Sequence, residues 1–235
     1  MDSGNEQGCQ SCFGYGHGTQ CASAQGFVAA NITTDFTGSN LGGWLRTPNS
    51  ADAMSTVGTD GLLIHGNLTL TAPPKYLGLH LNSYKQKLLL MKSSSVNFSP
   101  QDVLLLLAGQ EYNVQVRPDI SVSDNYSVVT FTLDENHLVA GEMTAFQFQS
   151  LLSNISSFKL RFRSESIVIS GIVLQSAVYD ASSIPQDQIS FVENVTCFEN
   201  YTGLACEVCA AGFTREIATS GPFAKCVLCS CNGRS

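Results

Sequence analysis

Cysteine is missing from the whole middle of this chain. None occurs between Cys21 and Cys197, whereas the two ends hold nine: Cys9, Cys12, Cys21, Cys197, Cys206, Cys209, Cys226, Cys229 and Cys231. With 43% apolar residues, the cysteine-free part is long enough to bury a core of its own. The cysteine-dense ends are too short to do so and need covalent staples. The distribution predicts a self-sufficient globule between two stapled ends.

Positive charge and long apolar runs are also scarce. Twelve Lys and Arg stand against 19 Asp and Glu, which gives a net charge of −7, and we expect no contact with nucleic acid or anionic lipid. No run approaches the ~20 apolar residues of a membrane-spanning helix, so membrane insertion is not expected. Residues 2–6 lack the charged and apolar regions of a signal peptide, and the chain is therefore interpreted as a fragment of a longer protein.

Catalytic motifs are absent as well. The four histidines show no His-x-x-x-His spacing, and neither a Gly-x-Ser-x-Gly elbow nor a phosphate loop occurs. The run Gly14-Tyr-Gly-His-Gly18 is typical of a turn. We expect no catalytic residues and no cofactor, and a hydrolase built on paired carboxylates is only a distant alternative.

What the chain has in excess is acceptor sites for N-glycosylation. Asn-x-Ser/Thr sequons start at seven positions: Asn31, Asn67, Asn97, Asn125, Asn154, Asn194 and Asn200. Together with clustered cysteines they predict secretion into an oxidising compartment.

The middle of the chain reads as short β-strands separated by turn residues. The expected strands are 27–36, 61–71, 77–81, 87–92, 103–107, 112–116, 126–133, 157–163 and 166–175, several of which alternate apolar with polar residues. Their spacing favours an antiparallel sandwich of jelly-roll type. Apolar residues near helical spacing predict one short helix over 144–154, packed across an end of the sandwich. Trp44 is expected in the core.

The cysteines at the end of the chain allow two interpretations. Cys206-x2-Cys209-x16-Cys226-x2-Cys229 has the spacing of a four-cysteine zinc ribbon. A single zinc ion would leave Cys197 and Cys231 unused, and the sequons place the chain where thiols oxidise. Disulfides are therefore favoured over zinc.

Longer motifs point to a family. The stretches 197–216 and 221–234 look like the closing half of a laminin EGF-like module and the first cysteines of the next, and Cys9-Gln-Ser-Cys12 to Cys21 resembles the opening half. Between them, 71–78, 83–88, 102–105, 146–154 and 192–197 resemble laminin domain IV type A, the globule that interrupts an EGF-like module in laminin short arms and in perlecan. The resemblance covers residues 9 to 234.

The resemblance implies a disulfide pattern. Carried over from the family, the bonds are Cys12–Cys21, Cys197–Cys206 and Cys209–Cys226, while Cys9, Cys229 and Cys231 would pair outside this sequence. The family's second and fourth cysteines, which bond to each other, fall on Gly14 and Val195 here. Both partners are absent together, which removes the cross-link without leaving a free thiol.

The expected fold class is all-β: a jelly-roll β-sandwich inserted into a disulfide-rich laminin EGF-like module. The expected domains are the opening part of that module at 9–21, the sandwich at 22–195, the closing part at 196–228 and the start of the next module at 229–235. Asp35 and Asp180, near the ends of the globule, are candidate ligands for a structural calcium ion. No other metal site is expected.

The resemblance implies a structural, non-enzymatic module of the extracellular matrix and basement membrane, a glycosylated spacer that presents a surface to other matrix proteins. The parent chain would belong to a hetero-oligomer and the fragment would be monomeric. The alternative is a lectin-like jelly roll that binds glycans, for which Tyr15, Tyr76, Tyr84, Tyr112 and Tyr126 are available.

Overall fold

The computed structural model describes residues 12–38, 40–49, 53–92, 100–119 and 128–229. The chain divides into two compact units, one formed by Val28–Tyr179 and the other by the segments on either side of it. The first is here called the sandwich and the second the stapled module. The described part contains no helix long and apolar enough to cross a membrane.

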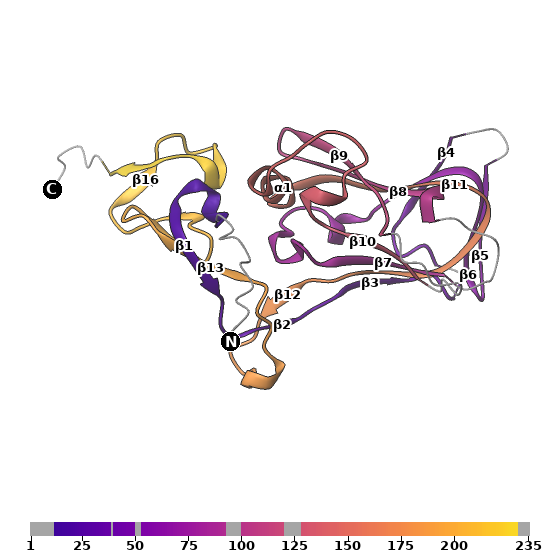
Figure 1. Ribbon diagram of the computed structural model, residues 1–235, viewed down its shortest axis with the longest axis horizontal. Helices are drawn as coiled ribbons and strands as arrows, with labels where there is room; N and C mark the ends of the chain where they lie inside the picture. The colour runs from indigo at the N-terminus through magenta and orange to yellow at the C-terminus, as the bar shows by residue number, and fades with distance from the viewer. Residues whose placement is uncertain (1–11, 39, 50–52, 93–99, 120–127, 230–235) are drawn as a thin grey trace, which may run out of the picture. The chain divides into compact units, whose positions relative to one another are not determined.

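The sandwich is all-β, as predicted (Figure 1). Its nine-stranded hydrogen-bonded sheet folds over a single core. The strands are β3 (Ile32–Asp35), β4 (Leu45–Pro48), β5 (Met54–Gly58), β6 (Gly61–Thr71), β7 (Lys87–Lys92), β8 (Val103–Gly109), β9 (Tyr112–Val116), β10 (Val128–Thr132) and β11 (Ile155–Leu174).

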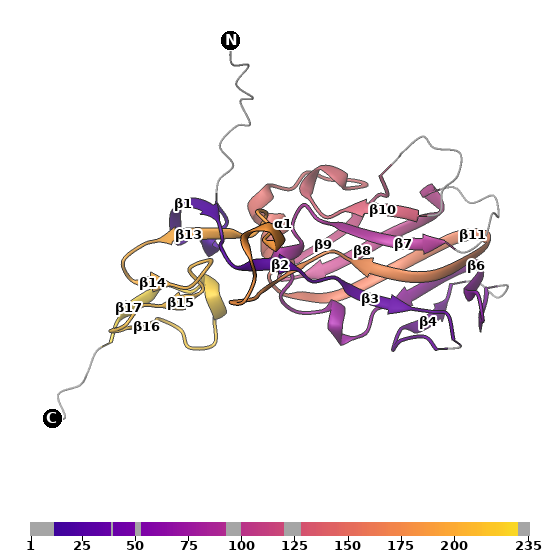
Figure 2. The ribbon, with the colours of Figure 1, turned by 90° about the horizontal axis from the view of Figure 1, so that it is seen from below.

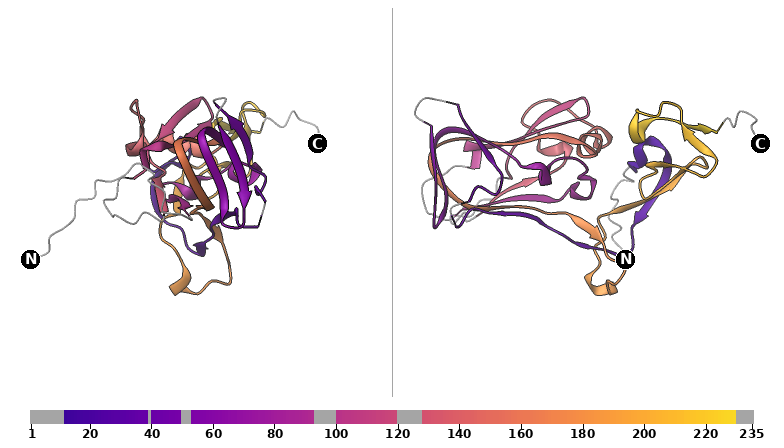
Figure 3. Two further views of the ribbon diagram at one scale, coloured as in Figure 1. Left: turned by 90° about the vertical axis from the view of Figure 1, so that its right-hand side faces the viewer. Right: turned by 180° about the vertical axis from the view of Figure 1, so that it is seen from behind.

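Strand β11 joins the two layers of the sandwich. Its first half pairs with β6 and β8. Its second half continues beside β6 as far as Ile169 and pairs with β7 and β3, as Figure 2 shows for β3, β7 and β11. A register shift between Ser164 and Ile167 separates the halves, and such irregularities bend a strand. The layers face each other across the core (Figure 3, right). The strands predicted at 157–163 and 166–175 are thus one bent strand.

Alternation of apolar residues explains which faces are buried. In β8, Val103, Leu105 and Leu107 are buried and the residues between them are partly exposed, the pattern of a strand with one face on the core. Trp44 is 1% exposed, which confirms its predicted place in the core. Its Nε1 donates to Thr34 Oγ1 at 3.1 Å, and that oxygen lies 2.9 Å from Tyr76 Oη, so the polar atoms of these three buried side chains are partnered.

The predicted helix is α1 (Ala145–Leu152). It begins at a capping box in which Thr144 Oγ1 accepts from the Gln147 backbone and Gln147 Oε1 accepts from the Thr144 backbone. Phe148, Leu151 and Leu152 are buried in the core.

Two strand predictions need correction. Residues 77–81 form no strand; Gly78 makes only an isolated bridge to Ile155, and the His80 N–H donates to Leu152 O. Hydrogen bonds to Ile155 and to the C-terminal end of α1 hold this loop, and its burial does not follow the apolar alternation, because Leu79 is exposed whereas His80 is buried. Residues 27–36 form two strands, β2 (Phe27–Ala29) and β3.

The stapled module is built from short strands: β1 (Gly18–Ser23), β13 (Glu193–Cys197), β14 (Tyr201–Thr202), β15 (Val208–Cys209), β16 (Phe213–Arg215) and β17 (Cys226–Leu228). β1 pairs with β13, β14 with β15, and β16 with β17. The β1–β13 ladder belongs to this module, and the compact sandwich covers residues 28–179. The bounds 22 and 195 stay a prediction for the inserted domain. β2 pairs with β12 (Ala177–Tyr179), where the chain passes between the units.

Candidate functional site: the disulfide-stapled module

Three disulfides hold the stapled module. The structure contains Cys12–Cys21, Cys197–Cys206 and Cys209–Cys226, with Cα–Cα distances of 5.6, 5.4 and 5.5 Å, within the usual range for such bonds. These are the pairs implied by the resemblance. Cys229 is exposed and unpaired in the described part of the chain, and Cys9 and Cys231 lie outside the described residues.

This pairing leaves no set of thiolates for zinc. Cys206, Cys209 and Cys226 are all bonded in disulfides, so three of the four ligands of the zinc-ribbon alternative are consumed. Over the described ranges, no group of three or more His, Cys, Asp or Glu side chains could hold a metal ion.

The β1–β13 ladder brings the two distant parts of the chain together. Gly18 pairs with Cys197, Cys21 with Val195 and Ser23 with Glu193. An inserted globule must return the chain close to where it left, and this register does so with Cys21 next to the segment that holds Cys197.

Gly14 and Val195 meet beside this ladder. A β-carbon placed on Gly14 would lie 3.7 Å from Val195 Cβ and 2.9 Å from Val195 Cγ1. Bonded cysteines have Cβ–Cβ distances close to 3.8 Å. The two positions where the resemblance expects bonded cysteines are therefore at bonding distance, although neither holds a cysteine.

Aromatic packing joins the opening and closing halves at the same place. The rings of Phe13 and Tyr15 lie 6.2 and 4.9 Å from that of Phe223, and His17 stacks on Tyr201 with ring centroids 3.9 Å apart. The halves are thus held by hydrogen bonds and packing, because no disulfide of the described residues links them.

His17 is the titratable group in this joint. Its Nε2 lies 3.2 Å from the carbonyl oxygen of Pro222. Burial is the main cause that lowers the pKa of His17, with the Arg215 guanidinium adding to it, against the opposing effect of the Pro222 contact. The neutral ring is therefore the form that the fold favours. Sequence reasoning did not find this role, because His17 stands in a run of turn residues.

The sequons differ in exposure. Asn31, Asn67, Asn154 and Asn194 are exposed, whereas Asn200 is half-buried and its Nδ2 donates to Cys226 O at 2.8 Å. Asn97 and Asn125 lie outside the described residues. The amide nitrogen of Asn200, to which a glycan would be attached, is thus already hydrogen-bonded within the stapled module.

The two calcium candidates each accept hydrogen bonds within a local turn. Asp35 Oδ1 accepts from the backbone and hydroxyl of Thr37, and Asp180 Oδ1 accepts from those of Ser182. These hydrogen bonds lower the pKa of both carboxyls. Each carboxylate closes a local turn, and the two belong to different units.

The tyrosines proposed for a lectin site are mostly inside. Tyr15, Tyr76 and Tyr84 are buried, and Tyr112 is partly buried; Tyr126 is outside the described residues. Exposed aromatic rings are what a glycan would stack on, so the lectin alternative gains no support.

One charged cluster was not foreseen from the sequence. His137 Nδ1 lies 2.6 Å from Asp134 Oδ1, and its Nε2 lies 3.5 Å from Asp119 Oδ1. Asp134 also accepts from the Asn136 backbone and Asp119 from Thr132. The cluster ties the segment after β9 to β10 and to the turn that follows it.

In this chain a β-sandwich is inserted into a disulfide-stapled module, so the fold is that of a protein with one domain inserted into another. The model of the family Laminin B (Domain IV) matches residues 69–193, and the chain belongs to this family.

Named proteins similar to the chain over most of its length are laminin subunits. The chain is 34% identical over 242 residues to laminin subunit gamma-3 of Mus musculus and 35% identical over 239 residues to that of Homo sapiens, in each case over 97% of this chain. It is 30% identical over 247 residues to laminin subunit gamma-1 of Homo sapiens, over 98% of this chain. The chain spans only 15% of the length of each of these proteins. The L4b domain of human laminin alpha-2 aligns with a TM-score of 0.41 and 9% identity, over 65% of this chain and 98% of that one.

Proposed function

We propose that this chain is a non-catalytic spacer module of a laminin-type short arm, which displays a glycosylated sandwich to other proteins of the extracellular matrix. The observation that carries the proposal is the β1–β13 ladder. It completes the stapled module from both sides of the inserted sandwich. The outer faces of the sandwich can therefore vary while the stapled module, which would connect to the neighbouring modules of the short arm, stays intact.

Several features support this role. Four of the sequons lie on exposed asparagines, which suits a secreted glycoprotein. The relatives are subunits of laminins, so the parent chain would assemble with other laminin-type chains and be deposited in the basement membrane. Catalysis is not part of the proposal, because the family that the chain belongs to is that of a laminin domain.

The test compares the whole chain with a variant in which a short Gly-Ser linker replaces residues 28–179. Glycosylated protein secreted from cultured cells is overlaid on a cell-free basement-membrane matrix, and the retained fraction is measured. We expect the whole chain to be retained and the linker variant to be lost. The linker variant serves as its own folding control, because peptide mapping must find the same three disulfides in it. Equal retention of both would refute a display role for the sandwich.

A further inference from the structure

Three cations stand in a row on the outer face of one layer of the sandwich. Lys159, Arg161 and Arg163 alternate along β11 with Phe158, Leu160 and Phe162, whose side chains are fully buried. Since successive residues of a strand point to opposite faces, the three cations share the outer face, with steps of about 7 Å between them. They are here called the β11 cation row.

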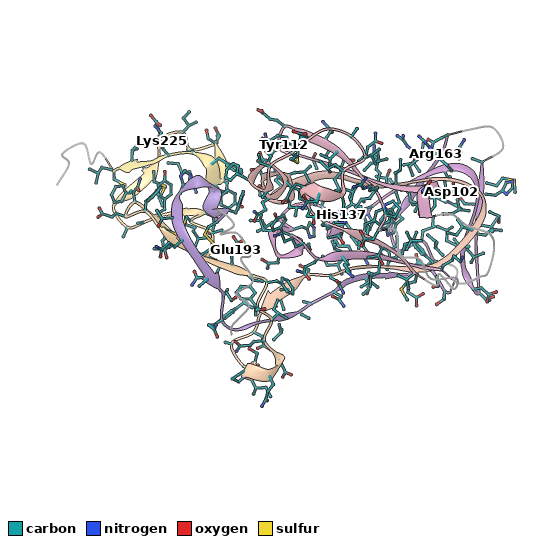
Figure 4. All side chains as sticks on the ribbon, in the orientation of Figure 1. Asp102, Tyr112, His137, Arg163, Glu193 and Lys225 are labelled. Atoms are coloured by element: carbon teal, nitrogen blue, oxygen red, sulfur yellow. A yellow bond between two sulfur atoms is a disulfide. The ribbon has the colours of Figure 1, made fainter. Side chains whose placement is uncertain are left out.

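No acidic residue stands directly across from the three cations on β6, or from Lys159 and Arg161 on β8. On β6, the residues paired with Lys159, Arg161 and Arg163 are Thr71, Thr69 and Asn67. On β8, the residues paired with Lys159 and Arg161 are Leu106 and Leu104. None of these five is acidic, in a chain that holds 19 acidic residues. Among the described residues, the side chains of the three cations make no hydrogen bond or ion pair. Acidic residues occur only at the Arg163 end of the row: Asp102 precedes Val103, the partner of Phe162, and lies beside Arg163 (Figure 4), and Glu165 follows Arg163 two residues later in the sequence.

A row of like charges at this spacing repels itself and attracts a line of opposite charge. A face that only needed to be soluble could carry basic and acidic residues together, as most protein surfaces do. The chain carries a net charge of −7, so a polyanion is repelled by most of its surface and attracted at this face. The row therefore points to a ligand with regularly repeated negative charges.

We propose that the β11 cation row binds a linear sulfated polysaccharide of the extracellular matrix. The inference rests on the proposed function. It identifies the face of the sandwich that would be displayed and the class of partner that would bind there. The hydroxyl of Thr71 and the amide of Asn67 flank the row on the β6 side and suit sugar hydroxyls. An acidic protein segment fits less well. The backbone of β11 is paired on both sides here, by β6 and β8, so a peptide could not be held by strand addition.

Asn67 sets the accessibility of the row. It is exposed and stands directly opposite Arg163 in the β6–β11 ladder, and directly opposed residues share one face of a sheet. A glycan on Asn67 would therefore cover the Arg163 end of the row. Removal of the glycan from Asn67 therefore strengthens binding of the polysaccharide, whereas removal of a glycan from Asn194 in the stapled module leaves that binding unchanged.

The test measures the dissociation constant of the whole secreted chain for heparin, used as the sulfated polysaccharide, at several salt concentrations. The variant carries Lys159→Gln, Arg161→Gln and Arg163→Gln. The matched control carries Lys75→Gln, Lys87→Gln and Lys225→Gln, three exposed lysines elsewhere, and so has the same net charge. We expect about a tenfold weaker affinity for the row variant than for the control, and binding by the unchanged chain that weakens as salt rises.

Each further result decides the proposal. Equal loss in the two variants would overturn it, since net charge alone would then govern binding. Tighter binding to poly-L-glutamate than to heparin would overturn it in favour of an acidic protein partner. A stronger affinity for heparin after Asn67→Gln, but not after Asn194→Gln, supports the placement of the ligand on the row. Absence of heparin binding with unchanged retention on matrix would overturn this inference and leave the proposed function standing.

Discussion

A β-carbon on Gly14 would lie 3.7 Å from Val195 Cβ, at the separation found in disulfides. The chain thus keeps the geometry of a cross-link between the opening and closing halves of its stapled module and lacks the sulfur atoms. Hydrogen bonds of the β1–β13 ladder and aromatic contacts take the place of that bond.

The double substitution Gly14→Cys and Val195→Cys is expected to form a fourth disulfide. A new bond contributes ~2–4 kcal/mol, from which ~1–2 kcal/mol is lost because residue 14 has a φ of +42° that favours glycine. We expect the stapled module to gain about 1–2 kcal/mol. Non-reducing peptide mapping should find the new bond, and the single variant Val195→Cys is the control. Two free thiols in the double variant would show that the positions do not meet.

His17 makes the joint between the halves sensitive to acid. Its pKa is lowered in the fold, chiefly by burial, so the neutral ring is bound more tightly than the charged one. The contribution of His17 to the stability of the stapled module is complete above the pKa of about 6.5 that it has in the unfolded chain. It is lost as the pH falls through the lower pKa that it has in the folded module. Thermal unfolding of the stapled module should therefore occur at a lower temperature at pH 5 than at pH 7.5. In His17→Phe, which keeps a ring against Tyr201, this difference should shrink; an unchanged difference would locate the titration elsewhere.

Trp44 should dominate the stability of the sandwich. It is 1% exposed and contacts the rings of Tyr76 and Phe158, so Trp44→Ala leaves a cavity and is expected to cost ~3–5 kcal/mol. Leu45 follows it in the chain and is 67% exposed; Leu45→Ala should change the free energy of unfolding by less than about 0.5 kcal/mol. Denaturant titration of both variants measures this. Similar values for the two would contradict the core assignment.

Glycan occupancy should follow the exposure of the described sequons. We expect glycans on Asn31, Asn67, Asn154 and Asn194, and little or none on Asn200, whose amide nitrogen donates to Cys226 O. Glycopeptide mass spectrometry of the secreted chain reads each site separately. Full occupancy of Asn200 with the three disulfides intact would show that this hydrogen bond is dispensable.

The sequence predicted those parts of the fold whose cause is local. Strands such as β8 bury one face and so leave a period of two, and the helix carries its own capping box at Thr144 and Gln147. The short strand β4 has no buried residue and showed no such pattern. The alternation at 77–81 misled because backbone hydrogen bonds to Leu152 and Ile155 hold these residues in a loop, in which Leu79 is exposed and His80 is buried.

The candidate site depended more on contacts between distant parts of the chain. The disulfide pairs followed from a family resemblance and not from spacing alone. Lys-x-Arg-x-Arg at 159–163 is visible in the sequence, yet its lack of acidic neighbours depends on the pairing of β11 with β6 and β8. The burial of Tyr15, Tyr76 and Tyr84 likewise could not be deduced from their positions in the chain.

The central claim is that the sandwich folds by burial of its own core, independently of the staples that close the module around it. Scanning calorimetry of the whole chain before and after reduction of the disulfides tests it most directly. All three described disulfides lie outside residues 28–179. We therefore expect the transition of the sandwich to persist after reduction at nearly the same temperature, while that of the stapled module disappears. Loss of both in a single transition on reduction would contradict the account.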